Sequence, residues 1–208
     1  MNLFAKVFRK AQSYIARIVN FTYEQYMRKN LKNKDFTILS SNCIAGVIYN
    51  RLGQQFCSPT INLWMRQRDL IELARNLKHY QNIPLTFVES KYDYPVAMLE
   101  NITIYFNHSK TKETARADWE RRMKRVNFEN LYIIIYDRED ITEEDILALD
   151  SISCRGKMVI SEKTYPHIPY VKTIRQGKLL LGTHFNQRTW FGLRAYEVYI
   201  DFVKWLNQ

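Results

Sequence analysis

Glycine, proline and cysteine are all scarce in this sequence. Its 208 residues include 6 Gly, 5 Pro and 3 Cys. The patterns GxGxxG, GxxxxGK[ST] and GxSxG are absent, which argues against a dinucleotide fold, a P-loop enzyme and the nucleophile elbow of α/β-hydrolases. HExxH and CxxC are absent too, so a zinc enzyme is not expected. Three cysteines without a disulfide framework are typical of a reducing compartment.

Long apolar runs are also missing. No window approaches the roughly 18 apolar residues that a helix needs to cross a bilayer. Arg9, Lys10 and Arg17 interrupt the N-terminal stretch where a signal peptide would be apolar. Hydrophobic residues at 46% and charged residues at 25% argue against disorder and suit one domain with a sizeable core. We therefore expect a cytoplasmic location.

Acidic residues are almost absent from the first sixth of the chain. Residues 1–34 hold eight Lys and Arg residues against Glu24 alone, which accounts for most of the net charge of +10. Charge concentrated in this way does not predict a surface that binds nucleic acid. Apolar residues at spacings of three and four fall within an arc of roughly 160° and predict an amphipathic helix over residues 2–32. Two alternatives stay open: the helix lies on the inner face of a membrane, or it packs against protein, either its own domain or a second copy in a homodimer.

The rest of the chain alternates between strand-like and helix-like segments. The most apolar run, Leu131–Tyr136, predicts a central strand that is buried on both faces. Other strands are predicted at Phe36–Ser40, Leu85–Glu89, Ile102–Asn107, Lys157–Ser161, Val171–Ile174 and Lys178–Gly182. Helices are predicted at Cys43–Leu52, Arg68–Tyr80, Thr111–Val126, after Thr142, and at Trp190–Leu206. The alternation predicts an α/β fold, with three α/β/α layers and a largely parallel sheet, formed by residues 35–208 as a single domain behind the basic helix and hinge of residues 1–34.

The turn Ser41-Asn42-Cys43 joins the first predicted strand to a helix and is the first candidate site. Sheets of this class bind ligands at the carboxyl ends of their strands. A helix N-terminus lowers the pKa of a thiol and offers free N–H groups to an anion. Cys43 is therefore a candidate nucleophile. The alternative is a buried cysteine that acts as a small apolar residue beside a structural N-cap.

Two further candidates follow predicted strands in the same way. His108 is a candidate general base or phosphate contact. Asp137 and Glu139 are similar to the Asp-x-Asp pair with which many nucleotide-sugar transferases hold Mg²⁺ or Mn²⁺, so a divalent metal is a candidate cofactor. The alternatives are an ordinary loop histidine and the acidic start of a helix, with Thr142 as N-cap and Asp145 at the capping-box position.

The predicted helix Thr111–Val126 is rich in arginine. Arg122 and Arg125 are candidates for bidentate phosphate binding, and Trp119 shares a face with Arg122 and is a candidate for stacking on a base or sugar. A solvated outer face is the alternative.

Four segments together resemble the bacterial family known as domain of unknown function 1919. In order along the chain they are FTILSSNCIAGVIYNRLG, CSPTINLWM, YPVAMLENITIYFNH and TARADWERRMKRVNFENLYIIIYDR. The resemblance covers roughly Asp35 to Lys163 and leaves the basic helix outside. Ile44 and Ala45 stand where the family has Trp and Gly. Its recurring residues, carried onto this chain, are Asn42, Cys43, Tyr49, Ser58, Pro59, Tyr94, Pro95, His108, Trp119, Arg122, Asn127, Asp137 and Arg138.

Members of that family are often labelled exopolysaccharide biosynthesis proteins, so the resemblance implies a role in surface-polysaccharide assembly and no particular reaction. The leading interpretation is a glycosyl- or related group-transferase that uses a sugar nucleotide or lipid-linked sugar, with Asp137, His108 and Cys43 as catalytic candidates. The candidates for binding its substrate are Asn42, Tyr49, Tyr94, Trp119, Arg122, Arg125, Asn127 and Arg138. A non-catalytic accessory protein and a hydrolase or acyltransferase built on Cys43 remain as alternatives.

Overall fold

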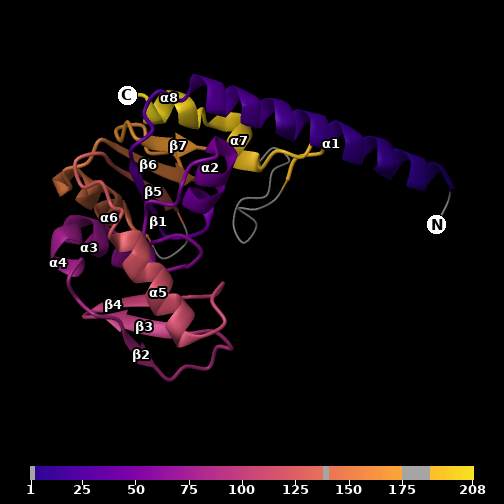
Figure 1. The fold of residues 1–208 in the computed structure, drawn as a ribbon. Helices are drawn as coiled ribbons and strands as arrows, with labels where there is room; N and C mark the ends of the chain where they lie inside the picture. The colour runs from indigo at the N-terminus through magenta and orange to yellow at the C-terminus, as the bar shows by residue number, and fades with distance from the viewer. Residues whose placement is uncertain (1–2, 138–140, 175–187) are drawn as a thin grey trace.

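A four-stranded parallel sheet forms the centre of the molecule. The computed structural model describes residues 3–137, 141–174 and 188–208 (Figure 1). The strand order is β1-β5-β6-β7, and every neighbouring pair is parallel. The strands are β1 (Thr37–Ser40), β5 (Leu131–Tyr136), β6 (Gly156–Ser161) and β7 (Val171–Thr173). The predicted α/β class is confirmed.

The central strand β5 is buried on both faces, as its sequence predicts. Ile133 and Ile135 point into one hydrophobic core, and Tyr132 and Ile134 point into a second core on the opposite face. All six residues of β5 are buried. Helices α3 (Gln67–Arg75) and α5 (Lys112–Met123) contribute to the first core, and helices α1 (Leu3–Asn30), α2 (Ile44–Leu52) and α8 (Phe202–Leu206) contribute to the second.

The two strands predicted at Leu85–Glu89 and Ile102–Asn107 belong to a separate antiparallel sheet instead of extending the central one, and a third strand that was not predicted lies between them. In this sheet, strands β2 (Thr86–Val88), β3 (Val96–Leu99) and β4 (Ile102–Tyr105) pair in the order β2-β3-β4. Only Glu100 and Asn101 separate β3 from β4, and Glu100 has a positive φ of 53°. A parallel pair needs a crossover of about a dozen residues, so this short turn forces the strands to be antiparallel.

The smaller helices follow local signals except at the C-terminus and at Asn76, which divides the single helix predicted at Arg68–Tyr80 into two. Gly53 ends α2 with a left-handed φ of 64°, and Thr142 and Asp145 form a capping box at α6 (Glu143–Leu147). The single helix predicted at Trp190–Leu206 is wrong, because Gly192 makes a turn with a φ of 94° before α7 (Ala195–Tyr199) and Asp201 then caps a separate α8. The predicted strand Lys178–Gly182 lies outside the described residues. The remaining elements are α4 (Leu77–Tyr80) and the 3-10 helix η1 (Ala148–Ser151).

Helix α1 crosses α2 and α8 and then extends past the rest of the fold toward its N-terminus (Figure 1). Near its C-terminus, Met27 is buried in the second core, which also includes Leu31 just after the helix. Within the part of the chain that the structure describes, no helix is both long and apolar enough to cross a bilayer.

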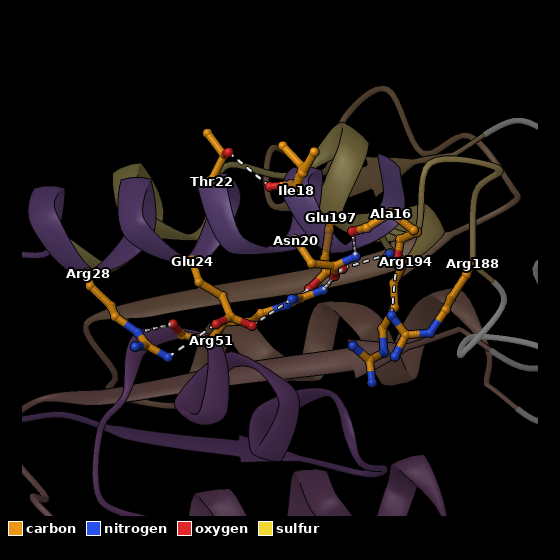
Figure 2. Close-up of polar contacts among 11 residues, drawn as sticks. Ala16, Ile18, Asn20, Thr22, Glu24, Arg28, Arg51, Arg188, Arg194 and Glu197 are labelled. Carbon is orange, nitrogen blue, oxygen red and sulfur yellow. Dashed lines mark hydrogen bonds and ion pairs between the residues drawn. The ribbon is translucent and has the colours of Figure 1, made fainter. Parts of the chain in front are cut away.

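A buried arginine, Arg51 of α2, joins α1 to the body. Its guanidinium donates to Glu197 of α7 at 2.8 and 3.1 Å, to Glu24 of α1 at 2.9 Å and to Asn20 of α1 at 2.5 Å (Figure 2). The side chains of Arg51 and Glu197 are only 8% and 2% exposed. Burial alone would lower the pKa of Arg51, but the hydrogen bonds and charges of Glu197 and Glu24 outweigh it and raise that pKa.

Arg51→Gln is expected to lower the free energy of unfolding by about 3–5 kcal/mol, because it leaves the Glu197 carboxylate buried without its charge partner. Urea titration followed by circular dichroism measures the change. The matched control is Arg75→Gln, which removes a 3.5 Å ion pair to Glu72 on the surface and should cost less than about 1 kcal/mol. Equal small losses for both variants would show that Arg51 does not hold the fold together.

Candidate functional site

Cys43 sits at the carboxyl end of β1, at the N-cap position of α2. The preceding turn is fixed by its own side chains. Ser40 Oγ donates to the carbonyl of Asn42 at 2.6 Å, and the backbone N–H of Ser40 donates to Thr60 Oγ1 at 3.0 Å. The position of the thiol is therefore set by a rigid strand end and by the loop that follows α2.

The first N–H groups of α2 are already occupied. The N–H of Ile44 donates to Asn42 Oδ1 at 3.0 Å, and the N–H of Ala45 donates to Ser40 Oγ at 3.3 Å. Asn42 is buried and acts as the cap of this turn. These two N–H groups are therefore already hydrogen-bonded within the protein and are not available to an anion.

His108 reaches Cys43 from the antiparallel sheet. After α2 the chain returns to the carboxyl end of β1, where the N–H of Met65 donates to the carbonyl of Ser41 at 3.1 Å. Next to it, Trp64 forms a β-bridge with Tyr105 at the end of β4, and their rings stack at 3.8 Å. His108 follows three residues later, so this bridge brings the end of β4 to the end of β1.

The thiol and the imidazole are in direct contact. Cys43 Sγ lies 3.3 Å from His108 Nε2. Burial raises the pKa of the Cys43 thiol above its ordinary value, and the positive charge of Arg194 partly offsets that rise. The lowered pKa expected at a helix N-terminus is therefore wrong for Cys43, because desolvation outweighs it. The resting thiol is neutral, and the neighbouring imidazole is the group in reach of its proton.

Cys43 and His108 open onto a pocket of about 820 Å³ between α1, α2 and the turn before α7. Asn62 lies on its wall with a positive φ of 58°. The pocket is lined by Asn20, Glu24, Arg28, Cys43, Gly46, Val47, Asn50, Arg51, Phe56, Asn62, His108, Arg188 and Arg194. Four of these residues are arginines and one is acidic, so the lining favours an anionic ligand.

Arg188 and Arg194 were not identified from the sequence. They pair across a β-bridge on either side of the Gly192 turn, and both side chains extend into the region below α1 (Figure 2). Arg188 also donates to the carbonyl of Gly192 at 2.9 Å. The turn was missed because one continuous helix was predicted over Trp190–Leu206. Gly192 was the local signal for a turn at this position.

Asp137 does not line this pocket. It directly follows β5, where its N–H donates to the carbonyl of Ile160 at 2.8 Å and its carboxylate accepts a hydrogen bond from Ser161 Oγ. Arg138, Glu139 and Asp140 lie outside the described residues. Among the described residues, no group of three or more His, Cys, Asp or Glu side chains is arranged to hold a metal ion.

The arginine helix α5 contributes to the core rather than to the pocket. Trp119 is buried and packs edge-on against Phe106. Arg122 is also buried and donates to the carbonyl of Ile61 at 2.7 Å and to Asp118 at 2.8 Å. Arg122 thus supports the loop after α2 from behind. Arg125 is partly buried and lowers the pKa of Cys57, against a larger opposing effect of burial.

The other predicted binding residues make structural contacts. Tyr49 is buried and donates to the carbonyl of Phe36 at 2.9 Å. Asn127 Oδ1 accepts from the N–H groups of two following residues, near the amino end of β1. Tyr94 stacks on Tyr92 at 4.9 Å beside the antiparallel sheet. Among the predicted site residues that the structure describes, only Cys43 and His108 line the pocket, and a substrate role for the others stays a prediction.

Comparison with known proteins agrees with the family resemblance. Residues 14–207 match the family described as "Domain of unknown function (DUF1919)". A protein of Haemophilus influenzae described as "Uncharacterized protein" is 31% identical over 203 residues, which cover 96% of this chain and 98% of the relative. The match extends beyond residues 35–163 and includes most of α1. The chain therefore belongs to the family of domain of unknown function 1919.

Proposed function

We propose that the chain is a thiol-dependent transferase that moves an acyl group from an anionic donor. The observation that carries the proposal is the 3.3 Å contact between Cys43 Sγ and His108 Nε2 on the wall of an arginine-lined pocket. A nucleophile within hydrogen-bond reach of a base is the usual arrangement of covalent acyl transfer. The family resemblance suggests that the reaction serves surface-polysaccharide assembly.

The reaction has two steps. Cys43 Sγ attacks the acyl carbon of the donor while His108 takes the thiol proton, and a thioester forms as the bond to the leaving group breaks. His108 then gives that proton to the leaving group. In the second step the acceptor, a hydroxyl of a sugar or a water molecule, attacks the thioester with His108 again acting as base. This step restores the Cys43 thiol.

The arginines supply the preference for an anion. Arg188 and Arg194 line the same pocket as the thiol, and guanidinium groups bind phosphate and carboxylate through paired hydrogen bonds. Arg51 adds little to this preference, because Glu24 and Glu197 neutralise its charge. The two arginines at the Gly192 turn are therefore the groups that would hold the charged part of the donor.

Acyl donors are expected to label Cys43. Incubation with acetyl-CoA, an anionic donor, or p-nitrophenyl acetate, a neutral one, should add one acetyl group to the protein by intact mass spectrometry. Cys43→Ser should abolish the label, His108→Ala should slow its formation at least tenfold, and Cys57→Ser should leave it unchanged. Arg188→Gln should slow labelling by acetyl-CoA about tenfold and labelling by p-nitrophenyl acetate less than twofold.

Unchanged labelling in Cys43→Ser, with an unaltered melting temperature, would contradict the assignment of Cys43 as nucleophile.

A sugar nucleotide is the second candidate ligand, because the same arginines suit a diphosphate and Asn50, Asn62 and Phe56 offer amide and aromatic contacts to a sugar. Thermal-shift measurements with UDP-, GDP- and CDP-sugars, with and without Mn²⁺, separate the two. Stabilisation by one of them that is lost in Arg188→Gln would favour a glycosyltransferase. No labelling and no stabilisation would favour an accessory role.

Alkylation of Cys43 should require alkaline pH. In a Cys57→Ser, Cys154→Ser background, the rate of reaction with iodoacetamide should rise with a midpoint above the ordinary thiol pKa of about 8.5, because burial raises the pKa of Cys43. Arg194→Gln should move the midpoint to still higher pH, since it removes a positive charge that favours thiolate. A midpoint near pH 7 would show that the thiolate is already stabilised at rest.

A further inference from the structure

The apolar stripe of α1 faces solvent. Ile18, Phe21 and Val7 are 65%, 63% and 61% exposed, although all three are large apolar side chains. The exposed apolar residues of the helix are Val7, Phe8, Tyr14, Ile15, Ile18, Phe21 and Tyr26. From Val7 to Phe21 they fall within an arc of roughly 140° at about 100° per residue. The stripe is continuous along the helix.

The face of α1 that contacts the body is the opposite one. Ala16 approaches the Gly192 turn, Asn20 and Glu24 bind Arg51, and Met27 enters the core. The centres of the two faces are roughly 180° apart on the helix. Packing against its own domain was one of the two alternatives for α1. The structure shows that packing, but it uses the polar face of the helix and leaves the apolar stripe exposed.

Basic and aromatic residues flank the stripe. Lys6, Lys10 and Arg17 lie along one edge, and residues 1–23 contain no acidic residue. At the other edge, Trp190 is 52% exposed and its ring lies 6.4 Å from that of Phe8. Tryptophan is favoured at the level of lipid headgroups, and lysine and arginine are attracted by anionic headgroups.

We propose that α1 docks this protein on an anionic lipid bilayer, lying in the interface with Val7, Ile18 and Phe21 directed into it. The match is between a solvent-facing apolar stripe with one basic edge and a surface that is apolar beneath a layer of negative charge. A second copy of the chain fits less well, because pairing two stripes would bring their basic edges together without acidic residues to offset them. The docking stands independently of the chemistry at Cys43.

Docking in this orientation holds the pocket close to the lipid. Asn20, Glu24 and Arg28 line the pocket from the body-facing side of α1, so one helix separates the pocket from the bilayer. The 28-residue helix presents its stripe on one side and part of the pocket wall on the other. A pocket held in this way favours substrates or acceptors that are themselves attached to lipid.

Vesicle flotation of the full chain tests the proposal. The protein should float with vesicles that contain 30% phosphatidylglycerol and bind vesicles of pure phosphatidylcholine at least tenfold more weakly. The double variant Ile18→Gln, Phe21→Gln keeps the net charge and should lose at least tenfold in partition coefficient. Ser13→Gln, on the opposite side of the helix, is the matched control and should bind as the parent does. Lys10→Gln with Arg17→Gln should weaken binding only to the anionic vesicles, by about tenfold.

Three results would overturn the proposal. One is equal flotation of the parent chain and the Ile18→Gln, Phe21→Gln variant. Another is equal binding to neutral and anionic vesicles, which would remove the role of the basic edge. The third is a dimer in analytical ultracentrifugation that the double variant dissociates, with no vesicle binding by the parent chain, because this would assign the stripe to a second copy. Acetyl labelling of Cys43 measures the pocket separately, so a failure of docking does not count against the proposed reaction.

Discussion

The arrangement of three helices centres on one buried ion pair, between Arg51 and Glu197. Arg51 lies at the junction of α1, α2 and α7, and its partners come from two distant parts of the chain, Asn20 and Glu24 from α1 and Glu197 from α7. A guanidinium is costly to bury and is tolerated only when its donors are satisfied, so it fixes the distance and rotation of every element that supplies an acceptor. Glu197 is the stronger constraint because it is more buried than Glu24 and receives two hydrogen bonds. The pocket wall and the orientation of α1 both follow from this arrangement.

The same interaction explains why α1 is turned with its apolar stripe outward. An amphipathic helix on a globular domain usually directs its apolar face to the core. Here the middle of the helix must present Asn20 and Glu24 to Arg51, and Gly192 packs tightly against Ala16 beside them, where a Cβ at position 192 would lie only 2.7 Å from Ala16 Cβ. Once these polar contacts are satisfied, Ile18 and Phe21 are forced to the far side. The exposure of the stripe is thus a consequence of packing and not an accident of a frayed terminus.

Sequence reasoning succeeded where the physical cause is local. The apolar run of β5 and the capping box at Thr142 appear as predicted, and α2 ends at Leu52 as predicted because Gly53 follows in a left-handed conformation. It failed where the cause is distant: Arg51 and Glu197 are separated by 146 positions, and nothing near either residue predicts the pair. Cys43 and His108 were both chosen because they follow strands, yet they meet through the bridge between Trp64 and Tyr105 and not through a shared parallel sheet. The rule thus selected two residues that meet in the structure, although the topology behind their contact is different, and their role in a functional site stays a prediction.

The environment of Cys43 balances reactivity against protection. Burial keeps the thiol protonated, and a neutral thiol resists oxidation because the thiolate is the reactive form. The positive charge of Arg194 lowers the pKa of the thiol. An anion bound to Arg194 would cancel part of that charge and so raise the pKa of the thiol further. Electrostatics alone would then leave Cys43, the proposed nucleophile, least active when an anionic substrate is bound. A base in contact with the thiol removes this conflict, because it accepts the proton only as the new bond forms. His108 Nε2, at 3.3 Å from the sulfur, stands where such a base is needed.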